Sequence, residues 1–494
     1  FKELNYLSDD NVQKMHEGII SVLSKVGVTV EDNIMREVLK EYGCSIDNKL
    51  QRVYFTEDVL KRALKTTPNG FLVKARNDEN DIIFKPGKNT LFLNAAGQKL
   101  YDYKTKTVKE PTRKEFYEYI KLLDALPNID IQNCFPMFGF EGVPQTMRLL
   151  ESAAAKLRMS TKVQIEGTTF DNYIFLNMMA QELNIEICQI VNSAAPLTYY
   201  SETAKQIRNY AKSGMPVHFA AGPLRGFTSP ISPAGAVINN HAETLAGLVM
   251  LQALKPGSRI WMNSMILTPD MQTGNPSFGN IYNSVTDIIH NQMWNHYGIP
   301  SWSNAASWTS SKEIDYQAGY ELILALLSQV LSRASAVSFQ GGLNAEITIS
   351  PEKAVIDDDI VGMVKQLVSL PDFSDDGFSL DLIHEIGPVP GSFLQTDETL
   401  FNWQNSCYVP NVASTEIYAK WERGGKKSII DRAHTRVNQI LSQHNVEKLS
   451  NSQEEKLEQI LNEARTYYYK KGLIPEDEWI LYQESIHSDT YPYA

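Results

Sequence analysis

Short apolar runs alternate with longer amphipathic stretches through the middle of the chain. One complete repeat consists of an apolar and aromatic run at 299–304, an amphipathic stretch at 315–333 and a second apolar run at 334–340. Apolar residues recur every fourth position within the central stretch, which predicts a helix with one buried face. Because a helical crossover joins parallel strands, the repeat predicts a strand, a helix and a second strand parallel to the first.

Eight apolar runs of this kind follow one another along the chain. The predicted strands are 90–94, 129–136, 162–167, 196–200, 216–221, 259–265, 299–304 and 334–340. A helix is expected after each strand, including one over about 172–191 between the third strand and the fourth. Strands that alternate with helices form a parallel sheet, and eight such units close into a barrel. The predicted fold class is α/β, a TIM (β/α)8 barrel with an N-terminal cap and a C-terminal helical extension.

The pattern divides the chain into three expected parts. Residues 1–85 mix short helices with short apolar runs and are interpreted as an N-terminal cap segment, residues 86–370 hold the barrel, and residues 371–494 form the C-terminal extension. Proline and glycine punctuate the start of this extension. The amphipathic stretches beyond them, expected as helices wrapped on the barrel, are 413–421, 428–441 and 453–469.

Composition narrows the functional classes. Of the 494 residues, 43% are hydrophobic and 21% are charged, which is typical of a globular protein. The net charge of -12 argues against a nucleic-acid partner, because phosphates attract a basic surface. No signal-peptide pattern and no apolar run of membrane-spanning length is present. The cysteines are scattered without CxxC pairs, so a reducing cytoplasm is expected; they are Cys44, Cys134, Cys188 and Cys407.

The C-terminal ends of the predicted strands supply candidate site residues, because active sites of TIM barrels lie at that end. Aromatic rings and amides dominate there, and no HExxH, GxSxG or phosphate-binding glycine motif accompanies them, so no metal site and no catalytic residue is assigned. Ring faces suit a quaternary ammonium ligand. Each aromatic residue could instead pack in the hydrophobic core without contacting a ligand. His218 could likewise have a structural role and not a catalytic one. The candidate substrate-binding residues are Glu166, Tyr199, Tyr200, His218, Asn263, Trp302, Asn304, Trp308, Phe339 and Gln340.

Five ordered motifs resemble one known family. They are SPAGAVINNHAETLAGLVMLQALKPG (Ser232–Gly257), HYGIP (His296–Pro300), DYQAGYE (Asp315–Glu321), EKAVIDDDIVGM (Glu352–Met363) and IGPVPGSFL (Ile386–Leu394). Together they are similar to the trimethylamine methyltransferase family of corrinoid-dependent barrel enzymes. The resemblance implies transfer of a methyl group from an amine to the Co(I) centre of a corrinoid (cobalamin) that a separate, cognate protein carries. No cofactor is therefore expected on this chain itself, and a homo-oligomer is expected.

Two departures from the family pattern indicate a branch within it. Members that act on trimethylamine place pyrrolysine in a region that falls within Trp302 to Trp308, where this chain has ordinary residues. Ser392 stands where the family motif GPGGHFL has histidine. The chain thus resembles the non-pyrrolysine branch, whose members act on quaternary amines. Glycine betaine is the expected substrate, with proline betaine or carnitine as alternatives. Its carboxylate is expected to bind Arg225, His218 or backbone N–H groups, and Arg225 could make a two-pronged contact.

Two other functional classes remain open from the sequence. A barrel lyase would place a lysine or a metal site at the strand ends, and neither is found there. A non-catalytic betaine-binding protein would have two lobes around a cleft.

Overall fold

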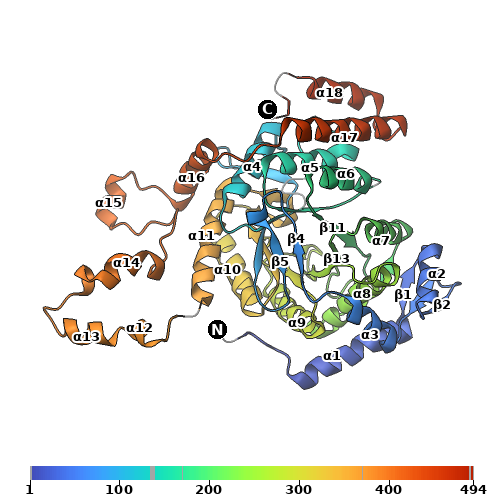
Figure 1. Cartoon of the computed structure of the whole chain (residues 1–494), viewed down its shortest axis with the longest axis horizontal. Helices are drawn as coiled ribbons and strands as arrows, with labels where there is room; N and C mark the ends of the chain where they lie inside the picture. The colour runs from blue at the N-terminus through green and yellow to red at the C-terminus, as the bar shows by residue number, and fades with distance from the viewer. Residues whose placement is uncertain (1–2, 134–138, 170, 370, 489–490, 493–494) are drawn as a thin grey trace.

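Eight parallel strands close into a barrel whose C-terminal ends meet at one mouth. The computed structural model describes residues 3–133, 139–169, 171–369, 371–488 and 491–492, and the strands follow one another around the barrel in the order β10-β11-β13-β14-β17-β18-β6-β9. The predicted TIM barrel is confirmed (Figure 1). The bounds are β6 Leu91–Asn94, β9 Ile131–Gln132, β10 Val163–Glu166, β11 Ile187–Asn192, β13 Val217–Ala221, β14 Ile260–Ser264, β17 Ser301–Ser303 and β18 Ala336–Gln340.

The predicted fourth strand was wrong. Residues 196–200 lie outside the barrel, and the fourth strand is β11, which falls where the sequence pattern predicted a helix over 172–191. That helix, α6, ends at Leu183 because Asn184 takes a left-handed conformation with φ 53° and caps it. The buried run that follows contains isoleucine and valine, which favour a strand. Thr198 and Tyr199 form β12, which instead pairs with β1 (Val28–Val30) of the N-terminal segment.

Eight helices cover the outside of the barrel. Local sequence signals set where they begin: the Thr112 and Glu115 side chains form a capping box at α4, and Asp315 caps α10 by accepting from the Ala318 N–H at 2.9 Å. α8 is almost fully buried, because α1, α3 and α9 pack on it. The bounds are α4 Arg113–Ala125, α5 Arg148–Met159, α6 Tyr173–Leu183, α7 Ser201–Ser213, α8 Pro233–Leu254, α9 Ile281–Tyr297, α10 Tyr316–Leu331 and α11 Pro351–Val368.

The N-terminal segment closes the bottom of the barrel. The hairpin of β4 (Phe71–Val73) and β5 (Ile82–Phe84) buries Phe71 and Phe84 in one cluster with Trp261 of the barrel interior. The other elements of this segment are α1 Asp9–Ser21, α2 Asn33–Glu41, β2 Ser45–Asp47, β3 Arg52–Tyr54 and α3 Glu57–Thr66. The mouth at the opposite end therefore provides the way into the barrel.

A small sheet joins two loops at the mouth. It has the order β19-β20-β7-β8, and it connects the loop after β6 to the loop after β18. The Gln98 N–H donates to the Ile347 carbonyl at 3.0 Å, which fixes the two loops against each other. The bounds are β7 Lys99–Asp102, β8 Thr107–Lys109, β19 Gly342–Leu343 and β20 Thr348–Ile349.

The C-terminal extension has two parts that behave differently. α16 (Ile429–Gln443) packs on α11 and α4, and α17 (Asn451–Lys470) packs on α6, as expected for helices wrapped on the barrel. Residues 372–423, here called the arm, instead project away from the barrel (Figure 1). Near the end of the arm, the Asn411 and Val412 N–H groups donate to Asp359 of α11 and attach it to the barrel. The stretch 413–421, predicted to wrap on the barrel, lies in the arm and forms only the short α15. The remaining bounds are α12 Asp375–Phe378, α13 Leu380–Ile386, α14 Asp397–Ser406, α15 Tyr418–Arg423 and α18 Glu476–Ile486.

No helix in the described ranges is both long enough and apolar enough to cross a membrane.

Candidate functional site

A stack of rings fills the lower half of the barrel. The Phe84 and Trp261 ring centroids are 4.3 Å apart, and Trp261 stacks on Trp302 at 5.1 Å with an interplanar angle of 15°. His218 meets both indoles edge to face at 5.0 Å. The Trp302 indole N–H donates to the Ser338 hydroxyl at 3.1 Å. Trp302 and His218 therefore form a fixed floor for whatever lies above them.

Strand periodicity brings a second layer of side chains above this floor. Residues two apart on a strand face the same side of a sheet, so Asn263 follows Trp261 into the barrel on β14, as Ala220 follows His218 on β13. Asn304, just beyond β17, likewise follows Trp302. The register agrees, since Asn263 is paired with Trp302 across β14 and β17.

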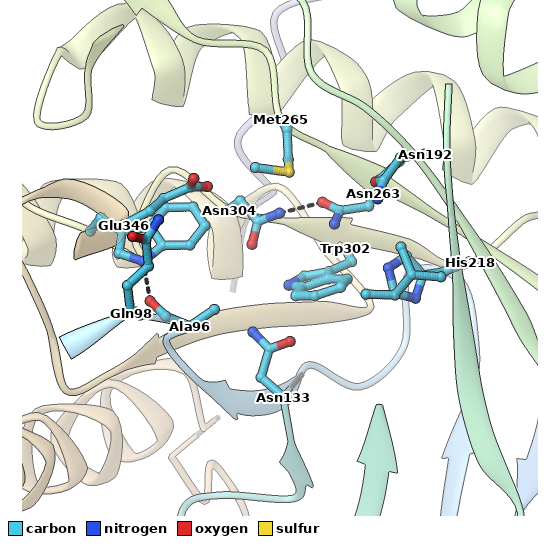
Figure 2. A pocket seen from close by; sticks show the side chains of 14 residues that line it. Ala96, Gln98, Asn133, Asn192, His218, Asn263, Met265, Trp302, Asn304 and Glu346 are labelled. Carbon is cyan, nitrogen blue, oxygen red and sulfur yellow. Dashed lines mark hydrogen bonds between the residues drawn. The ribbon is translucent and has the colours of Figure 1, made fainter. Parts of the chain in front are cut away.

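A cavity of about 360 Å³ lies between this layer and the mouth (Figure 2). It is within the size range of small-molecule sites. Five of the predicted residues line it: His218, Asn263, Trp302, Asn304 and Trp308. The rest of its lining is Ala96, Gly97, Gln98, Asn133, Ile190, Asn192, Ala220, Met265 and Glu346.

Hydrogen bonds behind the cavity hold its amides in place. The Asn304 side-chain amide donates to the Asn263 side-chain oxygen (Figure 2), and the Ser307 hydroxyl donates to the Asn304 oxygen at 3.1 Å. The buried Asp287 carboxylate accepts from the Ala305 N–H at 3.0 Å and from the Gln329 amide at 2.7 Å. Burial raises the pKa of Asp287 to about 6. The carboxylate thus fixes the loop that carries Asn304 without entering the cavity.

His218 is a neutral imidazole at the deep end of the cavity. Burial lowers its pKa to about 3, so it carries no charge at neutral pH. Neither ring nitrogen has a hydrogen-bond partner among the described residues. A buried polar group without a partner is costly, and a ligand that supplies one removes this cost. His218 is therefore suited to a polar but uncharged part of a ligand.

Trp308 forms one wall of the cavity. Its indole N–H donates to the Ala96 carbonyl at 2.7 Å, and its ring meets Phe278 edge to face at 5.5 Å. The side chain is 5% exposed. The ring is therefore held in one orientation before a ligand arrives.

Glu346 was missed by the sequence analysis, and it lies on the opposite side of the cavity from His218 (Figure 2). The turn that carries it begins with two residues in left-handed conformations, Asn344 at φ 47° and Ala345 at φ 59°. Such strain clusters at functional sites. No hydrogen bond or ion pair joins the Glu346 carboxylate to any residue in the described part of the chain, and burial raises its pKa. The cavity thus contains a carboxylate with no cation beside it.

Two further lining residues were missed for a simple reason. Asn192 ends β11, the strand that the sequence pattern assigned to a helix, and Asn133 directly follows β9. Correct strand ends would have placed both at the mouth. No pattern in the sequence singles out Glu346, because it lies in a turn between β19 and β20, three residues after β19 ends.

Three predicted residues from the third and fourth units lie elsewhere. Glu166 is buried in an ion pair with Lys156 and does not line the cavity. The buried Tyr199 hydroxyl donates to the Glu243 carbonyl at 2.9 Å, and Tyr200 is 54% exposed at the start of α7. Both tyrosines are misplaced because the strand that was expected to carry them is β12, outside the barrel.

Arg225, the expected carboxylate anchor, has its guanidinium engaged elsewhere. It donates to the Ile231 carbonyl and, at 2.9 Å, to the Thr268 hydroxyl, and it lies 5.0 Å from the centroid of the Tyr282 ring. It does not line the cavity. The loop after β13 therefore folds around Arg225 and keeps its charge from the site.

The last two predicted residues face outward from β18. Phe339 is buried in the cluster between the barrel and α10. The Gln340 amide donates to the Asn128 carbonyl at 2.9 Å. Neither lines the cavity. Ser338 faces Trp302, so Phe339 points the other way, and the register irregularity between Ser338 and Gln340 breaks the alternation that would otherwise return Gln340 to the interior.

The trimethylamine methyltransferase (MTTB) family matches residues 1–466. The chain belongs to this family. A glycine betaine methyltransferase of Desulfitobacterium hafniense (strain Y51) is 28% identical over 456 residues, covering 89% of this chain and 93% of the relative. Trimethylamine methyltransferase MttB of Methanosarcina thermophila is 26% identical over 475 residues, covering 90% and 95%. The crystal structure of Methanosarcina barkeri monomethylamine methyltransferase (MtmB) shares the fold, with a TM-score of 0.55 at 10% identity over 95% of this chain and 88% of that one.

The chain is therefore a methyltransferase, and the family resemblance predicted from the five motifs is confirmed. The two named relatives take their names from different methylated amines, and their identities to this chain are nearly equal. Identity alone does not select the methyl donor.

Proposed function

We propose that the protein transfers a methyl group from a quaternary amine to the Co(I) centre of a corrinoid held by a separate, cognate protein. The observation that carries this proposal is the cavity itself, where the indoles of Trp302 and Trp308 and the unpaired carboxylate of Glu346 surround one space. Ring faces and carboxylates are the groups that bind a cation without N–H donors. Glycine betaine is the donor that the sequence resemblance favours, and one relative bears its name.

The lining suits a donor that needs no acid catalysis. When a methyl group leaves a quaternary ammonium, the other product is a neutral tertiary amine that requires no proton. The described lining matches this requirement, since His218 is neutral and most other polar groups are amides. Co(I) supplies the nucleophile that accepts the methyl group. The chain's own part is to orient one N-methyl toward the mouth and to keep water from the reacting groups.

The aromatic rings and the carboxylate that surround the cation, here called the cage, affect the rate of methyl transfer as well as the affinity for the donor. Positive charge leaves the nitrogen as the methyl group departs, so a cage that binds the cation too tightly stabilises the ground state more than the transition state. The described lining has one carboxylate, that of Glu346, which limits this ground-state stabilisation. The rest of the contact with the cation comes from aromatic rings and not from further carboxylates, which is consistent with binding of moderate strength.

We also propose that the protein is a cytoplasmic homo-oligomer. The arm supports self-association, because it exposes large apolar side chains that a monomer would leave in water; among the most exposed are Val389, Leu394, Phe401 and Ile417. α10 exposes a second apolar stripe at Tyr316, Tyr320 and Leu324. The free cysteines Cys44, Cys188 and Cys407 are consistent with a reducing compartment.

An anaerobic methylation assay tests the proposed reaction. Purified protein is mixed with a Co(I) corrinoid protein and, in turn, with quaternary amines and trimethylamine, and corrinoid methylation is followed by absorbance. A quaternary amine should be the best donor, since no device that would activate trimethylamine is evident among the described lining residues. Turnover of trimethylamine at a rate comparable to the best quaternary amine would contradict the proposal.

A further inference from the structure

The charge of the cavity is unbalanced. Among the described residues that line the cavity, Glu346 is the acidic one, and none is a lysine or an arginine. The sequence of residues 134–138, CFPMF, contains none either. Arg225 is bonded to Ile231 and Thr268, and Lys156 is neutralised by Glu166. When Glu346 is ionised, it gives the cavity one negative charge that no cation among the described residues compensates.

We infer that the preferred methyl donor has a net positive charge: a quaternary ammonium whose remaining polar group is uncharged, such as a hydroxyl, and not a zwitterionic betaine. This inference rests on the proposed function and sharpens its substrate class. A quaternary cation beside Glu346 gives a neutral complex. A betaine beside Glu346 leaves one negative charge in a half-buried site without a cationic partner, and uncompensated buried charge is strongly unfavourable.

The deep end of the cavity supports the same choice. A carboxylate would require strong donors there, and the described groups are neutral: the imidazole of His218 and the side-chain amides of Asn133, Asn192 and Asn263. Neutral imidazole offers one acceptor nitrogen and one N–H donor, which together match a hydroxyl, itself both donor and acceptor. A carboxylate uses only the donor and leaves the acceptor nitrogen without a partner.

The two ends of the cavity also set the direction of such a ligand. His218 is the second residue of β13 and lies deep in the barrel, whereas Glu346 lies in a loop beyond β18 at the mouth (Figure 2). A ligand with its hydroxyl at His218 and its ammonium at Glu346 presents its N-methyl groups toward the mouth. This is the side from which the corrinoid protein must approach, so the charge argument and the reaction geometry agree.

Calorimetric binding, without any corrinoid protein, tests the inference. The ligands are choline, tetramethylammonium and glycine betaine. Choline should bind the unmodified protein at least about tenfold more tightly than glycine betaine, because its attraction to Glu346 is not opposed by a carboxylate. Glu346→Gln should remove most of this preference by weakening choline and not glycine betaine. Glu182→Gln, on the exposed face of α6, is the matched control and should leave the preference unchanged.

A second variant, Gln98→Lys, tests the same inference if the Glu346→Gln protein does not fold. Gln98 lines the cavity and is exposed, so Gln98→Lys adds a cation without burying it. This variant should shift the preference toward glycine betaine. Equal or tighter binding of glycine betaine by the unmodified protein, or a preference unaffected by both substitutions, would overturn the inference. Because binding is measured without methyl transfer, a protein that prefers choline but methylates no corrinoid would contradict the proposed reaction and leave this inference standing.

Discussion

Aromatic side chains are concentrated in two regions of this molecule, the barrel interior and the arm. They are buried in the barrel interior and exposed in the arm. Trp302 is 3% exposed, stacked on Trp261 and bonded through its N–H to Ser338. In the arm, Phe401 is 71% exposed and Tyr418 is 66% exposed. The comparison shows that aromatic residues mark a site only where the fold fixes and encloses them. In the arm the same residue types mark a surface that another copy of the chain is proposed to cover.

The largest expected effect comes from removing a ring of the barrel interior. Trp302→Ala should lower the free energy of unfolding by about 3–5 kcal/mol, because it leaves a cavity beside Trp261 and removes the N–H that donates to the Ser338 hydroxyl. Binding of quaternary amines should weaken by roughly 0.5–2 kcal/mol if the ring faces the ammonium. Denaturant unfolding and calorimetry measure the two losses separately.

Trp302→Phe is the control for this substitution. It keeps a ring in the stack but removes the N–H and part of the indole volume, so a smaller loss of stability, about 1–3 kcal/mol, is expected. If Trp302→Ala destabilises the protein no more than Trp302→Phe, the indole does not have the structural role that its stacking and burial indicate.

A smaller effect should come from the carboxyl group behind the cavity. Burial raises the pKa of Asp287 from 3.8 to about 6, so the folded protein binds this proton more tightly than the unfolded chain does. The contribution of Asp287 to stability is therefore greatest below about pH 4 and is lost as pH rises toward 6, which amounts to up to about 3 kcal/mol. Asp287→Asn should abolish this part of the pH dependence.

Unfolding of the two proteins at pH 4, 5, 6 and 7 measures this difference. Burial raises the pKa of Asp358 to about 6 as well, and Asp358 is present in both proteins, so the difference between them isolates Asp287. Because asparagine retains an oxygen that can accept from Ala305 and Gln329, methyl transfer should change only a few-fold. A stability difference that does not vary with pH would show that Asp287 is ionised in the folded protein throughout this range.

The smallest effect on stability is expected in the arm. Leu394→Ser combined with Phe401→Ser should change the free energy of unfolding of a single subunit by no more than about 0.5 kcal/mol per site, because both side chains are already exposed. The same pair should shift the protein toward smaller species in size-exclusion chromatography with light scattering. An unchanged mass would remove the arm from the proposed oligomer interface.

The sequence predicted the barrel well because its strands have a regular pattern. Seven of the predicted strands overlap barrel strands, and the error at 196–200 arose where two short apolar runs lay close together. Only a short turn separates Ile187–Asn192 from the preceding helix, so its apolar residues were interpreted as a continuation of that helix. The helix ends because Asn184 takes a left-handed conformation, and the sequence alone does not show this, since asparagine does not always take that conformation.

The site was harder to predict because it depends on loops. His218, Asn263 and Trp302 follow from strand alternation, since each lies on a strand whose place in the sequence was clear. Arg225 and Glu346 lie in loops, and the side chain of each is positioned by contacts with distant residues. The sequence pattern therefore located the floor of the cavity and gave no indication of its charge.

The closure of the barrel has a consequence for how the chain reaches its native state. Leu91 of β6 pairs with Ala336 of β18, so the ring cannot close until most of the polypeptide has left the ribosome. β1 likewise cannot pair until β12 has been synthesised, because β12 follows the fourth barrel strand in the chain. Contacts between such distant segments slow folding, and a growing chain with open sheet edges is prone to aggregate. Slow synthesis at low temperature and the presence of chaperones should therefore increase the yield of native enzyme.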